Sequence, residues 1–211
     1  MMKKIGIIAA ALTVALTTVP VQAKITADEA AKLGAELTPL GGEKAGNADG
    51  SIPAWTGGIT STPPGYSAGD FHPDPYAGET PEFVITAANY QQYADQLSEG
   101  LKKMFQTYPD TFKLPVYKTH RSASNPQFVY DATKENATRA TLLDDGNGMA
   151  GAAVGIPFPI PANGLEAIWN HIARYRGPAV QRNGGQAAVT AGGDYNVIGF
   201  DEQLLIQYSQ E

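Results

Sequence analysis

The chain has 211 residues, a formal net charge of −6 at pH 7 and no cysteine. An acidic chain without a run of basic residues argues against a nucleic-acid partner and gains little at an anionic membrane surface. The absence of cysteine excludes disulfides, thiolate metal sites and a cysteine nucleophile.

Residues 1–23 predict a cleaved export signal, with Lys3 and Lys4 before an apolar stretch and a small-residue cleavage site, Val21-Gln22-Ala23. An uncleaved anchor is the weaker alternative, because the apolar stretch is short for a membrane span. Removal of both lysines takes the formal charge from −6 to −8. We therefore expect an exported protein with no transmembrane segment in the mature chain, whose residues 24–211 form a single domain.

The mature chain begins with a predicted short helix and a long strap. Thr26 to Glu29 form a capping box, and Gly34 closes the helix. Residues 38–81 follow no period of 2 or 3.6, yet large apolar side chains are spread through them, which disordered linkers usually lack. We predict a long ordered Gly/Pro-rich strap anchored by these side chains: Ile52, Trp55, Ile59, Tyr66, Phe71 and Tyr76.

The next pattern predicts the longest helix, from a cap at Thr86 to about Thr107. Its apolar stripe includes Met104 and Phe105, and either forms core or lines a ligand cavity. After it, residues 112–116 alternate as a strand, and Pro115 predicts that this strand lies at an edge or contains a bulge. We expect a second short strand at residues 127–130 and one or two helical turns within 134–141.

A well-specified helix follows Pro157, Pro159 and Pro161. Asn163 is the predicted N-cap, and Glu166 is expected to return a bond to the N–H of that cap. Leu165, Ile168, Trp169 and Ile172 form one apolar face, whereas His171 and Arg174 lie on another side. Gly177 and Pro178 end the helix.

The C-terminal part predicts an antiparallel meander of three strands, at residues 186–190, 195–200 and 203–208. Turn residues at 192–194 and 201–202 join them. A final strand with an open edge leads us to expect the N-terminal part of a longer protein.

Several short motifs match known sites without their structural context. Gly65 to Gly69 matches a nucleophile elbow and Gly146 to Gly151 a dinucleotide loop, but prolines replace the required strand or helix. Asn47 to Gly50 is only a fragment of a calcium loop. His72, His120 and His171 lack the spacing of zinc ligands. We therefore predict no metal, no cofactor and no catalytic residue.

Two polar sets are more informative: residues 119–121, which include His120 and Arg121, and residues 170–176, which include His171 and Arg174. They would form a cationic patch that holds a carboxylate or phosphate head group. The alternative is that the arginines brace the strap by pairing with its acids, Glu43, Asp49 and Asp74.

Three stretches carry a family resemblance: residues 37–58, residues 116–121, and residues 157–177 from Pro157-Phe-Pro-Ile-Pro161 through Asn170-His171 to Arg174-Tyr-Arg-Gly177. They closely resemble a proteobacterial family of exported proteins described as a domain of unknown function, whose members are often labelled outer-membrane lipoprotein-sorting proteins. The resemblance covers nearly all of the mature chain. Members are considerably longer, which also implies an N-terminal part.

The resemblance implies an α+β fold like that of the periplasmic lipoprotein carriers of Gram-negative bacteria. In that fold a curved antiparallel sheet forms an unclosed barrel whose apolar concave face is covered by helices. It further implies a setting near the outer membrane, beside envelope transporters of the resistance-nodulation-division type.

We therefore expect a non-enzymatic periplasmic carrier or binding protein for a lipid or other hydrophobic molecule. The expected ligand contacts are apolar residues that line the cavity and polar residues that meet a head group: Trp169, Ile168, Ile172, Met104 and Phe105, and His171, Arg174 and Arg121. One alternative is a structural adaptor of an envelope transporter. Another is a hydrolase using His120 or His171, favoured if that histidine reaches both a carboxylate and an exposed hydroxyl.

Overall fold

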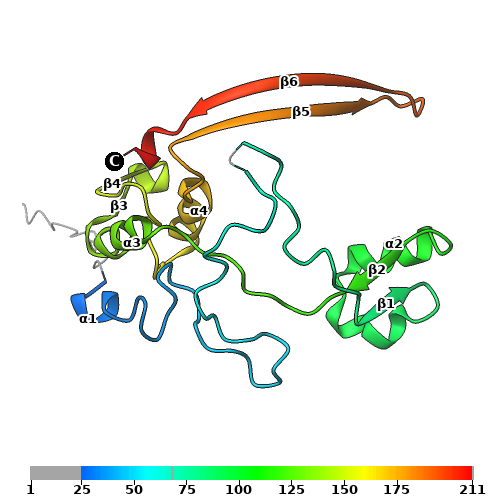
Figure 1. Cartoon of the computed structure of the whole chain (residues 1–211), viewed down its shortest axis with the longest axis horizontal. Coiled ribbons are helices and arrows are strands. Elements are labelled where there is room, and N and C mark those ends of the chain that lie inside the picture. The colour runs from blue at the N-terminus through cyan, green and yellow to red at the C-terminus, as the bar shows by residue number, and fades with distance from the viewer. Residues whose placement is uncertain (1–24, 68, 211) are drawn as a thin grey trace, which may run out of the picture.

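The computed structural model describes residues 25–67 and 69–210, and it is a mixed helix and strand structure. A body of short helices, a small separate lobe and one long hairpin are joined by extended loops (Figure 1). The strands form three two-stranded antiparallel sheets, and none of these closes into a barrel. The predicted export signal at residues 1–23 lies outside the described residues. No described helix has the length and apolar character needed to cross a membrane.

The N-terminal helix confirms its predicted capping box. Helix α1 spans Ala27–Ala30, the Oγ1 atom of Thr26 accepts from the Glu29 backbone N–H at 3.2 Å, and the Glu29 carboxylate accepts from the Thr26 N–H at 2.8 Å. Ala30 and Leu33 then pack against Ala137 of a longer helix in one of the two buried clusters. The short helix is thereby fixed to the body.

The strap at residues 38–81 contains no helix and no strand among its described residues beyond one isolated bridge at Glu43. Trp55 anchors it as predicted, because the indole N–H donates to the carbonyl of Ala123 at 3.0 Å. Tyr76 also anchors it, through a ring stacked on His120. Phe71 is not an anchor, since 96% of its surface is exposed.

The small lobe consists of β1 (Phe83–Thr86), the 3-10 segment η1 (Tyr90–Gln96), α2 (Glu99–Thr107) and β2 (Lys113–Val116). Strand β2 confirms the expectation at Pro115, which pairs with Val84 in a sheet that has only edge strands. The lobe has its own core, in which Phe105 is fully buried beside Ile85, Tyr90 and Leu97.

The prediction of one helix from Thr86 to Thr107 is wrong. The side chain of Asn89 accepts from the Thr86 N–H at 2.7 Å, and α2 begins only after Ser98, whose hydroxyl accepts from the Leu101 N–H. The apolar stripe could not distinguish one long α-helix from a 3-10 segment followed by an α-helix, because both kinds of helix place residues i and i+3 on one side. Leu97, in extended conformation, interrupts the helix and still points into the core.

The body is built on α3 (Gln127–Arg139), where a short strand at residues 127–130 was predicted and only the later turns were expected to be helical. The buried residues of α3 recur at helical spacing: Val129, Thr133, Asn136 and Ala137. Tertiary packing therefore favours a helix over the strand propensity of residues 127–130. A hairpin of β3 (Thr141–Leu143) and β4 (Gly148–Ala150) follows, joined by the 3-10 turn η2 (Asp144–Gly146).

Helix α4 (Gly164–Ala173) begins after Asn163, whose side chain accepts from the Glu166 N–H at 3.0 Å, as predicted. Glu166 does not return its bond to Asn163. Its carboxylate accepts from the Ala162 N–H at 2.6 Å, one residue before the cap. The Asn170 side chain bonds both backbone groups of Phe158, which ties the proline-rich approach to the helix.

The chain then forms a hairpin of two long strands, β5 (Ala179–Val189) and β6 (Tyr195–Leu205). The predicted turn at residues 192–194 is confirmed: Gly193 has a φ of 88° and the Thr190 N–H donates to the carbonyl of Asp194 at 2.8 Å. The predicted third strand at residues 203–208 is wrong, since β6 continues to Leu205.

After β6 a 3-10 turn, η3 (Gln207–Ser209), returns the chain to the body. The Tyr208 hydroxyl donates to the carbonyl of Gly155 at 2.7 Å, and the Val154 N–H donates to the carbonyl of Tyr208 at 2.8 Å. Burial raises the pKa of Tyr208 above its ordinary value. The base of the hairpin is therefore fixed to the body.

Asn136 offers a test of how the body is held together. It is fully buried, and its side chain donates to the carbonyls of Ala153 and Ile156 and accepts from the Ala153 N–H. Asn136→Ala leaves these backbone groups without partners, so we expect a loss of about 2–3 kcal/mol in unfolding free energy by urea titration. Exposed Thr138 on the same helix is the control, and Thr138→Ala should change stability by less than about 0.5 kcal/mol. Equal effects of the two substitutions would contradict this role.

Candidate functional site

Arg121 lies where the strap crosses the connection between β2 and α3. Its guanidinium donates to four backbone carbonyls of the strap, those of Glu43, Lys44, Ala45 and Pro53, at 2.5–3.3 Å. Of the two predicted roles for this arginine, the contacts are those of a brace. The partners are backbone carbonyls rather than the carboxylates of Glu43, Asp49 or Asp74.

The strap and this connection also pair through their backbones. The Ile59 N–H donates to the carbonyl of Ser122 at 2.9 Å, and the Ser124 hydroxyl donates to the carbonyl of Ile59. Gly58 has a φ of 73°, and a Cβ at this position would collide with the backbone of Ser122 and Ala123. The close approach of the two segments therefore requires glycine.

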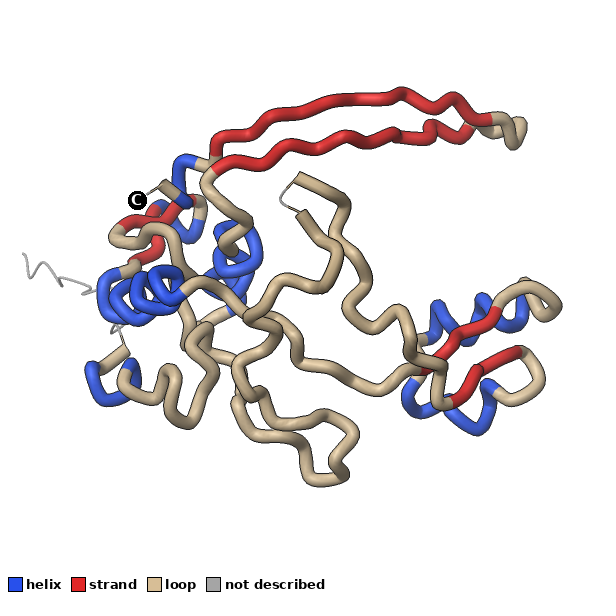
Figure 2. Tube along the Cα trace, in the orientation of Figure 1, coloured by secondary structure: helices blue, strands red, loops and turns tan. Residues whose placement is uncertain are grey.

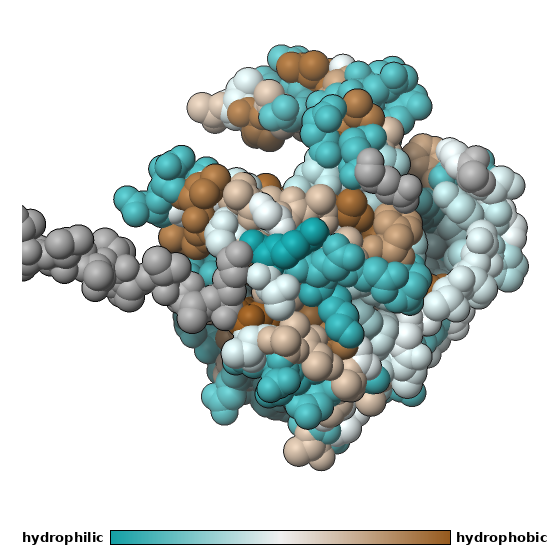
Figure 3. Space-filling model, turned by 90° about the vertical axis from the view of Figure 1, so that its left-hand side faces the viewer, coloured by the Kyte–Doolittle hydropathy of each residue, from teal (hydrophilic) through white to brown (hydrophobic). Residues whose placement is uncertain are grey.

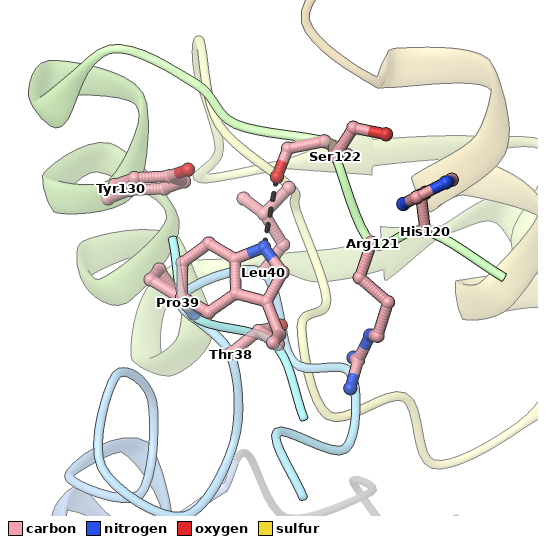
Figure 4. A pocket seen from close by; sticks show the side chains of 9 residues that line it. Thr38, Pro39, Leu40, His120, Arg121, Ser122 and Tyr130 are labelled. Carbon is pink, nitrogen blue, oxygen red and sulfur yellow. Dashed lines mark hydrogen bonds between the residues drawn. The ribbon is translucent and has the colours of Figure 1, made fainter. Parts of the chain in front are cut away.

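A cavity of about 400 Å³ lies at this crossing (Figure 4). Its walls come from the strap, from the connection and from α3: Thr38, Pro39, Leu40, Trp55, His120, Arg121, Ser122, Ala123 and Tyr130. The Trp55 indole spans one side and is fixed by its bond to the carbonyl of Ala123. The Tyr130 hydroxyl accepts from the Asn125 N–H at 2.7 Å. The cavity thus combines an aromatic wall with hydroxyl groups and a histidine. We call it the Trp55–His120 cavity.

His120 is held on two sides. Its Nε2 atom lies 2.7 Å from a carboxylate oxygen of Glu79, and its ring stacks on Tyr76 with the centroids 3.8 Å apart and the planes at 7°. A second cavity of about 300 Å³ lies against Glu79, Lys118 and His120. This pair joins the two chain segments that lead into and out of the small lobe. No group of three metal-ligating side chains occurs in the part of the chain that the structure describes.

Helix α4 presents part of its predicted apolar face to solvent. Ile168 is 58% exposed and Ile172 is 49% exposed, and Leu165 of the same stripe is half exposed. Trp169 turns inward, where its indole N–H donates to the carbonyl of Gly146 at 2.9 Å. We call Leu165, Ile168 and Ile172 the α4 stripe.

His171 and Arg174 lie next to this stripe, near the end of α4. Both are exposed, and a guanidinium nitrogen of Arg174 donates to the carbonyl of His171 at 2.7 Å. This bond caps the helix C-terminus, where a cation is favourable. It uses one of the five donors of the guanidinium.

The β5–β6 hairpin carries large apolar side chains on both faces. Strand alternation places Val189, Tyr195 and Val197 on one face and Ile198 and Phe200 on the other, and all five are exposed. The hairpin extends away from the body along most of its length (Figure 2), and hydrophobic side chains are visible over it at the top of Figure 3. An Arg182–Glu202 ion pair joins its two strands.

The eight predicted ligand contacts do not converge on one place. Met104 and Phe105 belong to the small lobe, away from α4 (Figure 1), and Phe105 is fully buried in the core of that lobe. Arg121 lies in the strap crossing. The other five lie on α4 or at its C-terminal end: Ile168, Trp169, His171, Ile172 and Arg174. Of these, Trp169 faces inward.

Sequence reasoning missed Glu79, Ser122 and Tyr130 as parts of a site. Trp55 and His120 were singled out for other roles, as a strap anchor and as a possible hydrolase residue. Glu79 stands 41 positions before its histidine, and nothing in the sequence links the two. The sequence signal that pointed to this region is the polar set at residues 119–121, which was predicted as part of a cationic patch.

A family model described as "Protein of unknown function (DUF1329)" matches residues 84–211. An uncharacterized protein of Pseudomonas aeruginosa is 51% identical over 196 residues, which is 93% of this chain and 43% of that relative. The chain therefore spans less than half the length of the curated relative it matches. No solved structure matches the chain.

The brace at Arg121 is testable by hydrogen exchange. Arg121→Lys keeps the charge but cannot present a planar fork of donors to several carbonyls, so the strap should open more often. We expect the amide of Trp55, which donates to the carbonyl of Lys44 at 2.9 Å, to exchange about tenfold faster or more. Arg174→Lys is the matched control and should leave this amide unchanged. Unchanged exchange in Arg121→Lys would show that the strap does not depend on the guanidinium.

Proposed function

This chain belongs to the DUF1329 family of proteins of unknown function, and we propose that it is the N-terminal part of a non-enzymatic periplasmic carrier for a lipid or other hydrophobic molecule. In this proposal the export signal is cleaved after Ala23 and the mature protein is located at or near the outer membrane. It is related to lipoprotein-sorting proteins, and its partner is an envelope transporter of the resistance-nodulation-division type.

One observation carries the proposal: the α4 stripe and both faces of the β5–β6 hairpin expose large apolar side chains. Groups of exposed apolar side chains of this kind are typical of binding sites in folded proteins. An acyl chain that covers it leaves water, and each methylene group so buried contributes about 0.8 kcal/mol. A hydrophobic ligand suits this surface better than a charged one.

The hairpin supports the finer fold in this proposal. Two 11-residue strands with free edges form only a marginal sheet by themselves. The relative from Pseudomonas aeruginosa is more than twice as long as the matched stretch. We infer that β5 and β6 are strands of a curved antiparallel sheet that the rest of such a longer protein extends, and that α4 covers its concave face.

His171 and Arg174 are the proposed contacts for the polar end of the ligand. They lie together at the end of α4, beside Ile172, and both side chains are exposed. A guanidinium offers a planar, paired set of donors to a carboxylate or phosphate. Arg121 does not share this role in the proposal, since its guanidinium is bound to strap carbonyls.

A periplasmic hydrolase is the second candidate, favoured by the 2.7 Å contact between His120 and Glu79 and by Ser122 in the adjoining cavity. A nucleophile must lie within hydrogen-bond reach of its base. Among the described residues His120 bonds only to Glu79, so this candidate ranks second. A structural adaptor with the same apolar surface is the remaining alternative.

The first experiment is to express the full-length precursor, purify the mature protein from the periplasm without detergent, and weigh it and its extract by mass spectrometry. We expect a chain that begins at Lys24 and a hydrophobic molecule in about equimolar amount. An empty protein that also takes up no added fluorescent fatty acid would contradict the carrier. It would direct work to the adaptor, and then to ester-hydrolysis assays with Ser122→Ala as control.

The α4 stripe can be tested separately. The double change Ile168→Ser and Ile172→Ser removes two apolar contacts worth about 1 kcal/mol each. The affinity for a fluorescent fatty acid should therefore fall about 30-fold. Tyr108→Ser, at an exposed aromatic of the small lobe, is the control and should leave affinity unchanged. An equal loss in both proteins, or no loss in either, would exclude the stripe.

The contact proposed for the polar end of the ligand is tested by Arg174→Ala. It should weaken retention of the fatty acid about tenfold, as expected for the loss of a charge-assisted hydrogen bond, while the protein stays folded and loses no more stability than one helix cap contributes. Arg176→Ala, two residues further along, is the matched control. Retention equal to that of the unmodified protein would exclude Arg174 from the site.

A further inference from the structure

We infer that the Trp55–His120 cavity is a separate ligand site that binds a neutral molecule composed of an apolar ring or chain and a hydroxyl group. This site goes beyond the proposed carrier function, because it shares no residue with the α4 stripe or the hairpin. The cavity, at about 400 Å³, is within the size range of small-molecule sites.

The walls of this cavity are fixed before any ligand arrives. Trp55 is bonded to the carbonyl of Ala123, and its own backbone N–H is bonded to the carbonyl of Lys44. The same carbonyl of Lys44 is held by Arg121. A ligand therefore meets an aromatic wall whose ordering is already complete, which lowers the entropic cost of binding.

Glu79 sets the chemistry of His120. A carboxylate can only accept a hydrogen bond, so the proton of the neutral imidazole lies on Nε2, which faces Glu79 at 2.7 Å. The other nitrogen, Nδ1, is then an acceptor. The ring stacks on Tyr76, which fixes its plane, and Figure 4 shows the imidazole at the edge of the cavity.

Two hydroxyl groups complete the set, one on α3 and one on the connection that also carries His120. The Tyr130 hydroxyl accepts from the Asn125 N–H and keeps its own proton for donation. Ser122 also lines the cavity. A ligand hydroxyl is both donor and acceptor, so it suits a site that offers an imidazole acceptor and a hydroxyl donor.

The charges at the site disfavour an anion. Arg121 is the one permanently charged side chain of the lining, and its guanidinium is bound to strap carbonyls. A carboxylate would therefore enter without a free cation, at the cost of its desolvation. Among ligands of one shape, the neutral alcohol or phenol should bind best.

Three naphthalenes of similar shape test this inference on the full-length mature protein: 2-naphthol, 2-methoxynaphthalene, which lacks the donor, and 2-naphthoate, which is an anion. Isothermal titration gives the affinities, and the NMR signal of the Trp55 indole N–H locates the site. We expect 2-naphthol to shift this signal and to bind about tenfold more tightly than either analogue.

His120→Phe keeps the ring that stacks on Tyr76 and removes the acceptor. It should lower the affinity for 2-naphthol about tenfold while leaving that for 2-methoxynaphthalene unchanged. His72→Phe is the matched control, because His72 contacts Tyr66 in an edge-to-face pair beside another cavity. This control should bind 2-naphthol as the unmodified protein does.

The unmodified protein gives a second measurement that needs no variant. The ¹⁵N shifts of the His120 imidazole should show a proton on Nε2 and a bare Nδ1 that responds to 2-naphthol. A proton on Nδ1, equal affinities for the three compounds, or binding of 2-naphthol that leaves the Trp55 signal in place would each overturn the inference. None of these results depends on whether a lipid is carried.

Discussion

The hydrogen bonds from Arg121 to the strap are the constraint on which the rest of the structure depends. A segment without helix or strand must satisfy its carbonyls elsewhere, since unpaired polar groups in a packed region are costly. One guanidinium satisfies four of them, from Glu43 to Pro53. The strap then presents Trp55 to the connection at Ala123. The crossing in turn places His120 against Tyr76 and Glu79, at the entrance to the small lobe.

The hairpin differs from the strap, because the bonds that fix it to the body lie at its base. Phe200 covers Gly184 across the strands, and the Arg182–Glu202 pair lies two positions further along, so the register is well specified. A strand that is apolar on both faces is typical of a sheet covered on both sides. In the proposed carrier, these exposed side chains contact the hydrophobic ligand or further strands of the sheet.

The sequence allowed prediction of those elements whose signals are local. The capping box at Thr26, the helix after Asn163 and the turn at Gly193 depend on neighbouring residues, and all three are confirmed. The errors lie where distant packing decides. Residues 127–130 have the composition of a strand, but Val129 and Thr133 are buried at helical spacing. Thr86 looks like a cap, but it ends a strand paired with residue Lys113.

The same distinction applies to the candidate site. Patterns of charge pointed to Arg121 and His120, whereas their partners are backbone carbonyls and a carboxylate far away in sequence, which carry no local signature. The sequence analysis also grouped Met104 and Phe105 with α4 as ligand contacts, because the spacing of apolar residues does not indicate which core they pack into. Phe105 packs in the core of its own lobe, where its ring contacts Tyr90 and Phe112.

These contacts separate the arginines by function. Every hydrogen bond of the Arg121 guanidinium in the described residues goes to a strap carbonyl, so binding a ligand anion would require the strap to lose these bonds. Among the described residues the Arg174 guanidinium donates only to the carbonyl of His171, near the end of its own helix. It can turn most of its donors to an anion without unfolding anything, because a helix C-terminus is readily capped by water. A cation that braces a loop and a cation that meets a ligand are thus distinguished by what each would lose on binding. By that criterion Arg174, at the end of α4, is the arginine to which we assign the proposed head-group contact.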